Sequence, residues 1–264
     1  MSFITIPTPA ATSGTCGDNL TWKLDDKGTF TISGKGSMYD YSSSSNAPWY
    51  SSRASITNVV INDGVTSIGN YAFYWCSSLS SITIPDSVTT IGNYAFEDCS
   101  YLTNINIPDS VTSIGSYAFS GCEGLTSVNI TNIEAWCNID FNSKEANPLY
   151  YAKNLYLSGK LVTNLTIEKN VTSIGDSAFF HCKSLTSVTI RGSVTSIGCM
   201  AFCYCSNLTS IAIGGSVISI GDYAFYDCTK LATVSYSGNE SAWNSIYISS
   251  NNVALTSAEK KYFG

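Results

Sequence analysis

The feature that most constrains the fold is a unit of 23 residues that recurs along the chain. Its first copy, VTSIGNYAFYWCSSLSSITIPDS, begins at Val65, and near-copies follow at the same spacing except for one longer interval between Val111 and Val171. A unit this short cannot bury its apolar face alone, so successive units have to stack on one another. The six copies begin at Val65, Val88, Val111, Val171, Val194 and Val217.

A period of about 20 to 29 residues with regular aliphatic positions is typical of a leucine-rich-repeat solenoid. The end of each unit alternates polar and apolar residues, as in Leu-Ser-Ser-Ile-Thr-Ile, which predicts a strand with one buried face. We expect one parallel sheet of about eight rungs, with the Tyr-Ala-Phe segments as short helical turns whose Phe rings stack. The strands are expected to begin at Ile56, Leu79, Leu102, Leu125, Val162, Leu185, Leu208 and Leu231.

The inward positions follow from the same pattern. A glycine that recurs directly after the first Ile of each unit, as Gly69 follows Ile68, is expected to allow a tight turn or a close approach of backbone. In the first unit the predicted inward residues are Val65, Ile68, Ala72, Phe73, Cys76, Leu79, Ile82 and Ile84.

Outside the units the chain divides into further segments. Residues 1–13 are expected to be a disordered linker, and residues 14–55 a capping segment that contains a β-hairpin. Residues 56–264 form the repeat region, with an irregular insertion at 131–160 and a C-terminal cap at 237–264. Trp136 and Trp243 align in these last two segments, and Ser158-Gly159 suggests a hairpin that bulges from one edge.

The charge composition excludes several classes of function. Asp, Glu, Lys and Arg make up 12% of the chain, and 13 basic against 19 acidic residues give a net charge of −6. Clustered cations for nucleic acid or an anionic membrane are therefore lacking. Residues 1–14 do not have the regions of a signal peptide, and no apolar run reaches the length of a membrane span.

The cysteines could indicate disulfides, metal ligands or buried thiols. Six of the ten occupy one inward position of the unit, where parallel side chains on adjacent rungs disfavour disulfide geometry. We therefore expect a column of reduced cysteines. Cys199, Cys203 and Cys205 with His181 superficially resemble a metal set, but their spacing is not that of a zinc site. The column consists of Cys76, Cys99, Cys122, Cys182, Cys205 and Cys228.

The pattern AFxxCxxLxxIxIPxSVTxIGxxAF resembles the BspA-like leucine-rich repeats of bacterial and protist surface proteins. The N-terminal segment CGDNLTWKLDDKGTFTISG and the insertion also resemble segments that accompany such repeats. The resemblance implies an extracellular or cell-surface protein with an adhesive or protein-binding role. It implies neither an enzymatic activity nor a cofactor.

The exposed strand positions carry Ser, Thr and Asn, with no aromatic or charged residue. Binding hot spots are enriched in Trp, Tyr and Arg, so this face is a poor candidate for binding a partner. One interpretation is a set of polar ladders that pair with their neighbours. Another is a regular hydroxyl array that matches ice or another periodic surface.

The loop edge offers better candidates, because two variable positions lie between the repeated Phe and Cys. These positions carry aromatics that, if exposed, suit contact with protein or glycan; the alternative is their burial against neighbouring rungs. The candidate partner-binding residues are Tyr74, Trp75, Phe180, His181, Tyr204 and Tyr226.

Catalysis is not expected. His181 is the single histidine, Cys182 is expected to be buried and Cys203 is the remaining thiol candidate, with nothing to orient a base. The exposed carboxylates Glu97 and Asp98 lie three rungs or more from Asp227. We therefore expect a non-catalytic adhesion or protein-interaction module that binds host extracellular matrix or a neighbouring cell surface. The alternatives are a carbohydrate-binding module and a passive spacer in a larger surface protein.

Overall fold

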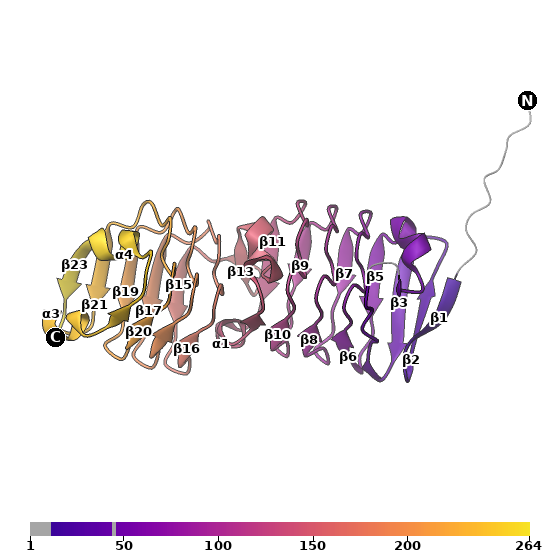
Figure 1. Ribbon diagram of the computed structural model, residues 1–264, viewed down its shortest axis with the longest axis horizontal. Coiled ribbons are helices and arrows are strands. Elements are labelled where there is room, and N and C mark those ends of the chain that lie inside the picture. The colour runs from indigo at the N-terminus through magenta and orange to yellow at the C-terminus, as the bar shows by residue number, and fades with distance from the viewer. Residues whose placement is uncertain (1–11, 44–45) are drawn as a thin grey trace, which may run out of the picture.

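The protein is an elongated stack of strands with few short helices, as seen in a computed structural model that describes residues 12–43 and 46–264 (Figure 1). The 23-residue units lie side by side along the long axis. An N-terminal antiparallel hairpin occupies one end and β23 (Glu259–Tyr262) lies near the other. The linker predicted for residues 1–13 falls outside the described residues, except that Thr12 and Ser13 belong to β1.

The long strands of the units form three sheets, so the expectation of a single eight-rung sheet is wrong. The insertion interrupts the ladder, and β7 and β9 lie beside each other without forming one. The sheets consist of β1 (Thr12–Gly17), β2 (Leu20–Leu24), β3 (Thr29–Gly34), β5 (Asn58–Ile61) and β7 (Ser81–Thr83); of β9 (Asn104–Asn106), β11 (Ser127–Ile130), β13 (Leu155–Leu157) and β14 (Lys160–Leu161); and of β15 (Asn164–Ile167), β17 (Ser187–Ile190), β19 (Ser210–Ile213), β21 (Thr233–Tyr236) and β23.

A second parallel ladder of very short strands runs along the stack, and the sequence pattern did not predict it. It too is interrupted at the insertion. Its first part consists of β4 (Gly36–Ser37), β6 (Val65–Ile68), β8 (Thr90–Ile91), β10 (Ser113–Ile114) and β12 (Asp140–Phe141), and its second of β16 (Ser173–Ile174), β18 (Ser196–Ile197), β20 (Ser219–Ile220) and β22 (Tyr247–Ile248).

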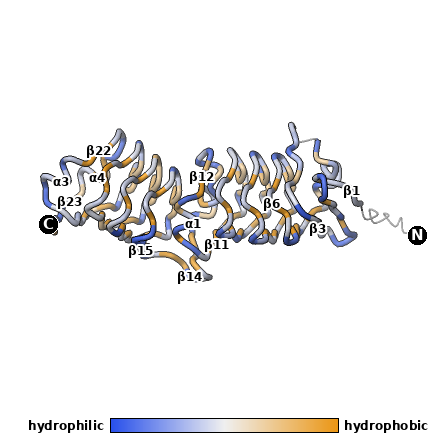
Figure 2. The backbone as a smooth tube through the Cα atoms, turned by 90° about the horizontal axis from the view of Figure 1, so that it is seen from below, coloured by the Kyte–Doolittle hydropathy of each residue, from blue (hydrophilic) through white to orange (hydrophobic). Residues whose placement is uncertain are grey.

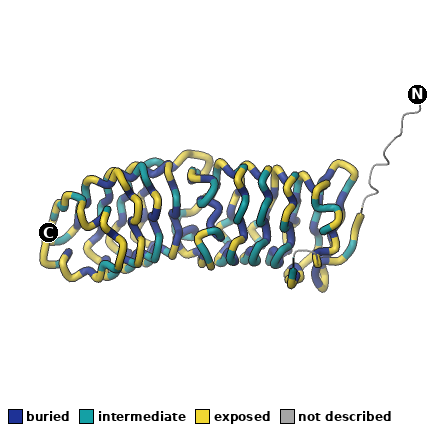
Figure 3. The backbone as a smooth tube through the Cα atoms, turned by 45° about the horizontal axis from the view of Figure 1, so that its top comes forward, coloured by how far each residue is buried: buried dark blue, intermediate teal, exposed yellow. Residues whose placement is uncertain are grey.

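The core lies between the two ladders and the turn segments, and all eight inward positions predicted for the first unit are buried. Equivalent side chains of successive units form continuous columns. Phe73 and Phe96 stack with their ring centroids 5.5 Å apart, and Phe96 and Phe119 with theirs 5.4 Å apart. Each unit thus buries its apolar face on the next, as the period requires. Figure 3 shows the resulting alternation of buried and exposed positions in each unit.

The Tyr-Ala-Phe segments are turns and not the short helices that we expected. The amides of Tyr71, Phe73 and Trp75 donate to carbonyls of the following unit, at 2.9, 2.8 and 2.8 Å. Tyr71 and Trp75 both have a φ of 57°, which a right-handed helix does not allow. The hydrogen bonds that would close a helix are therefore used to join successive units.

The recurring glycine serves a close approach of backbone. A Cβ on Gly92 would lie 2.5 Å from the amide nitrogen of Asn70, and the same conflict recurs at Gly115 with Asn93. A side chain at this position would push adjacent units apart.

All ten cysteines are free, and nine of them are buried. The thiols of Cys99 and Cys122 donate to the carbonyls of Phe73 and Phe96, at 3.3 and 3.1 Å. Burial raises the pKa of Cys76 and of Cys137 to about 12. The repeated cysteine is therefore a protonated donor inside the core.

Each of the two runs of three units begins against a buried tryptophan. The indole of Trp49 donates to the Ala72 carbonyl at 2.7 Å, and that of Trp136 donates to the Ala178 carbonyl at 2.8 Å. Trp49 precedes the short 3-10 helix η2 (Tyr50–Ser55), and Trp136 lies in α1 (Ile133–Cys137). We call residues 12–43 and 46–130, which contain the first run, the N-terminal block. Residues 162–264, which contain the second run, are the C-terminal block.

The insertion between the blocks contributes its own elements. These are α1, β12, the 3-10 helix η3 (Lys144–Ala146) and α2 (Leu149–Ala152), followed by β13 and β14. The hairpin expected at Ser158-Gly159 is confirmed, since β13 and β14 pair antiparallel and both turn residues have positive φ, 49° and 77°. Figure 2 shows this hairpin projecting from the stack at β14.

The C-terminal segment completes the last unit. It contains α3 (Glu240–Asn244), with Trp243 buried on Tyr236, and α4 (Val253–Ser257). The side chain of buried Asn252 accepts from the Phe225 amide at 2.9 Å, where earlier units use a backbone carbonyl of the next unit. An amide side chain thus replaces the missing neighbour.

Candidate functional site

The turn segments place the candidate residues on one side of the stack. Their alternate amides bind the next unit, so successive segments lie in register, and the insertion takes one place in this series. The Phe119 amide donates to the Glu145 carbonyl, and Asn147 Nδ2 donates to the carbonyls of Ser177 and Ala178. The turn side is therefore continuous from the N-terminal block through the insertion to the C-terminal block.

Tyr74 and Trp75 belong to an aromatic group on the N-terminal block. Trp75 is 49% exposed, and its ring lies 6.0 Å from that of Tyr74 with an interplanar angle of 6°. The Trp75 indole donates to Asp98 Oδ2 of the next unit. Burial raises the pKa of Tyr74, with the neighbouring carboxylates of Glu97 and Asp98 acting in the same direction.

A stack of tyrosines extends this group, and our sequence reasoning missed it. Tyr71 and Tyr94 stack at 4.8 Å, and Tyr94 and Tyr117 at 5.3 Å. The signal was present in the Tyr-Ala-Phe repeat, since a tyrosine that recurs at one position of successive units must lie beside its own copies. The Trp75 cluster comprises Tyr71, Tyr74, Trp75, Tyr94 and Tyr117.

The other four candidates lie together on the C-terminal block, but they are not equally exposed. Tyr204 and Tyr226 are 39% and 42% exposed, with ring centroids 5.6 Å apart. Phe180 is only 3% exposed, because Tyr150 of the insertion stacks on it at 5.5 Å. The expectation that Phe180 is an exposed aromatic is corrected: it supports the surface from below.

His181 lies among these rings and is half-buried. Its Nδ1 is 2.9 Å from the Tyr150 carbonyl, and its ring lies 5.9 Å from that of Tyr204. Burial lowers the pKa of His181, and the contact with the Tyr150 carbonyl opposes this effect. The neutral imidazole is thus one more ring of the cluster. The Tyr204 cluster comprises Tyr150, Phe180, His181, Tyr204, Tyr223 and Tyr226.

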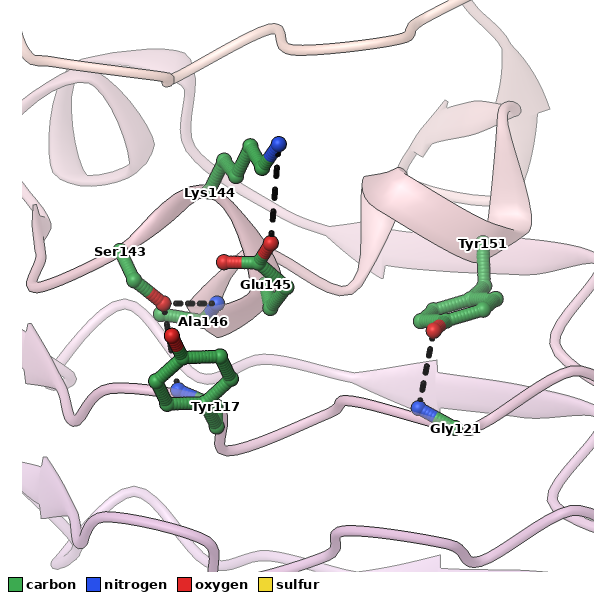
Figure 4. A network of polar contacts seen from close by, with 7 residues as sticks. All are labelled: Tyr117, Gly121, Ser143, Lys144, Glu145, Ala146 and Tyr151. Carbon is green, nitrogen blue, oxygen red and sulfur yellow. Dashed lines mark hydrogen bonds and ion pairs between the residues drawn. The ribbon is translucent and has the colours of Figure 1, made fainter.

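The insertion separates the two clusters and is tied to the N-terminal block by polar contacts (Figure 4). Tyr151 Oη accepts from the Gly121 amide at 2.9 Å. Ser143 Oγ accepts from the amides of Tyr117 and Ala146, each at 3.2 Å. The position of Tyr150, and with it the burial of Phe180, therefore depends on contacts across the boundary between the blocks.

The thiols near His181 are not activated as nucleophiles. Burial raises the pKa of Cys182 to about 11 and that of Cys203 to about 12, so both are protonated at neutral pH. Within residues 12–43 and 46–264, no three His, Cys, Asp or Glu side chains lie close enough to hold a metal ion. The arrangement can offer stacking and hydrogen bonding to a partner.

The polar strand face consists of ladders. Ser81 Oγ donates to Asn58 Oδ1 at 2.7 Å, and Ser187 Oγ donates to Asn164 Oδ1 at 2.6 Å. The hydroxyl of Thr126 donates to the Thr103 carbonyl at 3.0 Å. These hydroxyls bond within the protein, which favours the ladder interpretation over a periodic binding array.

The repeated units, their parallel ladders and the exposed edge define a leucine-rich-repeat protein. The family model for the BspA type leucine rich repeat region, in 6 copies, matches residues 45–155 and 150–259. The chain therefore belongs to the BspA type leucine-rich-repeat family.

Several solved structures of bacterial leucine-rich repeat proteins are similar to this chain. A leucine-rich repeat protein from Eubacterium ventriosum is 27% identical with a TM-score of 0.48, over 86% of this chain and 73% of that one. One from Bacteroides ovatus is 25% identical with a TM-score of 0.43, over 93% and 70%. A leucine rich cell surface protein from Faecalibacterium prausnitzii is 21% identical with a TM-score of 0.25, over 91% and 98%. The comparison with curated proteins finds no match.

In the part of the chain that the structure describes, no helix has the length and apolar character needed to cross a membrane.

Proposed function

We propose that the protein is a non-catalytic adhesion or protein-interaction module of the extracellular space or cell surface. Proteins of the leucine-rich-repeat family are generally binding modules that mediate protein interactions. The observation that carries the proposal is the exposure of Trp75, Tyr204 and Tyr226 along the turn side. The partner is a protein of host extracellular matrix or of a neighbouring cell surface.

Binding to these aromatic clusters should cost little conformational entropy. Tyr and Trp supply a large contact area and lose little rotamer freedom, and they are over-represented among binding hot spots. Here the rings are already packed against one another, as Tyr204 is with Tyr226 and His181. A partner would therefore meet a surface that is largely ordered before it binds.

A carbohydrate ligand is the second candidate, and the geometry around Trp75 favours it. The ring of Trp75, which is exposed and lies parallel to the ring of Tyr74, offers an apolar platform, with the carboxylate of Asp98 beside it as an acceptor. A sugar ring could stack on the platform and donate a hydroxyl to the carboxylate. A passive spacer role is the third alternative, in which neither cluster binds anything.

The test is a pull-down from host extracellular matrix and neighbouring bacterial surfaces, paired with a glycan array. We expect Tyr204→Ala/Tyr226→Ala to lose protein capture at least tenfold at unchanged thermal stability. The matched control is Tyr247→Ala, which removes a tyrosine that is 70% exposed on β22.

The result separates the three functions. Glycan binding that Trp75→Ala abolishes would favour the carbohydrate module. Capture that is equal for the double variant and the control would remove the support for the Tyr204 cluster, and no capture by any form would favour a spacer.

A further inference from the structure

The long strand β15, which starts the third sheet, has one edge without a partner strand. It pairs with β17 on one side, and no other strand in residues 12–43 and 46–264 pairs with its opposite edge. The cause is the insertion: after β13 the chain turns back, and β14 pairs antiparallel with β13. In the described residues, no strand therefore takes the place of a parallel neighbour between the hairpin and β15.

The backbone groups on this open edge can be assigned from the ladder on the other side. Ser187 N donates to the Thr163 carbonyl at 3.2 Å, and Arg191 N donates to the Ile167 carbonyl at 3.0 Å. Backbone groups of successive strand residues point to opposite edges. The amides and carbonyls of Asn164 and Thr166 therefore point away from β17, toward the open edge.

A groove of about 580 Å³ lies along this edge. Its walls are the β15 residues and the projecting hairpin, whose Leu161 is 45% exposed. An extended segment that bonded to Asn164 and Thr166 could bury its apolar side chains on the apolar part of the lining. That part consists of Ile133, Leu157, Leu161, Val162, Leu165 and Val171.

The charged residues of the groove favour a basic residue at the C-terminal end of such a segment. The carboxylates of Glu134 and Glu168 both line it, and Glu168 directly follows β15. On the paired edge, Arg191 follows β17 and lies 3.4 Å from Glu168. A parallel strand on the open edge with a basic residue after its last apolar position would place that residue near Glu168 in the same way. The carboxylate of Glu134, which accepts from Asn170 Nδ2, adds to the negative charge of the groove. Lys160 of β14 lies on the hairpin wall.

We propose that this groove binds an extended segment of a partner protein by parallel addition of a strand to β15. The segment alternates small polar and β-branched residues and ends in Lys or Arg, which is the pattern of β17 and Arg191. Main-chain hydrogen bonds would supply the affinity, and the apolar lining and carboxylates would supply the specificity. This site is distinct from the aromatic clusters of the turn side.

The experiment uses the full chain and a fluorescein-labelled peptide with the sequence of residues 185–191, LTSVTIR, followed by fluorescence anisotropy. We expect saturable binding. Thr166→Pro removes an N–H that the β15–β17 ladder does not use, and proline is tolerated on the open edge of a sheet. It should weaken binding at least tenfold, whereas Thr166→Val, which keeps the N–H, should bind the peptide as before.

A second arm leaves the protein unchanged, in case Thr166→Pro does not fold. In the ladders here, the apolar residues of each strand point their backbone to the next strand, as Ile167 does to Arg191. N-methylation of the Val and Ile of the peptide should therefore abolish binding, and N-methylation of its Ser should not. Glu168→Gln should weaken the arginine peptide several-fold and leave a glutamine-ended peptide unaffected.

Three outcomes would overturn the proposal. The first is no binding of the peptide, and the second is equal binding to Thr166→Pro and to wild type. The third is a dimer of the protein that Thr166→Pro dissociates, which would assign the groove to a second copy. Tyr204→Ala/Tyr226→Ala should bind the peptide normally, so failure of the aromatic proposal and of this one can be told apart.

Discussion

At the scale of single residues, the repeated cysteine shows how one side chain joins neighbouring units. Its thiol is small enough for the space beside the Phe column, and it donates to a carbonyl of the preceding unit, as Cys205 does to Phe179 at 3.2 Å. Burial raises its pKa well above the ordinary value. Six of the ten cysteines therefore reflect the number of repeats, and their count carries no information on the redox compartment.

This assignment predicts thiol reactivity. Cys199 is the one cysteine of the ten that is not buried, and burial together with Asp176 and Asp222 raises its pKa too. We expect a chromogenic disulfide reagent at pH 8 to modify at most one thiol of the native protein, slowly, and all ten in guanidinium chloride. Cys199→Ser should show no modification in the native state. Rapid labelling of several thiols would contradict the buried column.

His181 predicts a dependence of stability on pH. Its pKa is lowered in the folded protein, mainly by burial, from about 6.5 in an unfolded chain. The unfolded state thus binds the proton more readily, so the histidine's contribution to stability is complete above pH 6.5 and declines as the pH falls toward the folded pKa. Between pH 7.5 and 5.5, the urea midpoint of wild type should fall further than that of His181→Gln. Equal falls would contradict this role.

At the scale of elements, the termini of the blocks carry the groups that replace missing units. Asn252 is 3% exposed, and its Nδ2 donates to the Gly221 carbonyl at 2.9 Å while its Oδ1 accepts from the Phe225 amide. Asn147 acts similarly on the first unit of the C-terminal block. Both side chains satisfy backbone groups that would otherwise be buried without a partner.

Removal of this cap should therefore be costly. Asn252→Ala leaves the Phe225 amide and the Gly221 carbonyl without these partners, and a buried unsatisfied group costs about 1–3 kcal/mol. We expect a loss of that size in the free energy of unfolding, measured by urea denaturation. Asn104→Ala, at an exposed strand position, is the control and should change stability by less than about 0.5 kcal/mol. Equal effects of the two substitutions would contradict the capping role.

Much of the core could be predicted because a residue that recurs every 23 positions must meet its own copy. The second ladder could not, since strands as short as Thr90–Ile91 show no alternation. The local sequence of the Tyr-Ala-Phe segments allows a helical turn as well as the turn that forms. The hydrogen bonds to the next unit select the second conformation.

In the candidate site, too, some features could be predicted from the sequence and others could not. The exposure of Trp75, Tyr204 and Tyr226 follows from their variable position in the unit. The sequence left open whether Phe180 is exposed or buried, because the ring that covers it, Tyr150, comes from an irregular segment 30 residues earlier in the chain. No sequence signal marked the open edge of β15 either, since it results from where the hairpin turns.

At the scale of the whole molecule, contacts made by the insertion couple the two blocks. Both long and short ladders are interrupted there, so contacts such as those of Trp136 and Asn147 replace strand pairing between the blocks. In a repeat protein, stability is a sum of unit terms and terms between nearest neighbours. The interface in the middle of the stack, where both ladders are interrupted, is therefore where cooperative unfolding is most easily lost.

Trp136→Ala tests this coupling. The indole is 1% exposed and donates to the Ala178 carbonyl, and truncation of a core tryptophan costs about 3–5 kcal/mol. We expect wild type to unfold in one transition in urea and the variant in two, with the second at the midpoint of the more stable isolated block. The control is Trp243→Ala, which removes a tryptophan that is 7% exposed in the C-terminal segment and should lower the midpoint without dividing the transition. Coincident single transitions by circular dichroism and fluorescence for Trp136→Ala would mean that other contacts of the insertion, such as those of Asn147, couple the blocks without the indole.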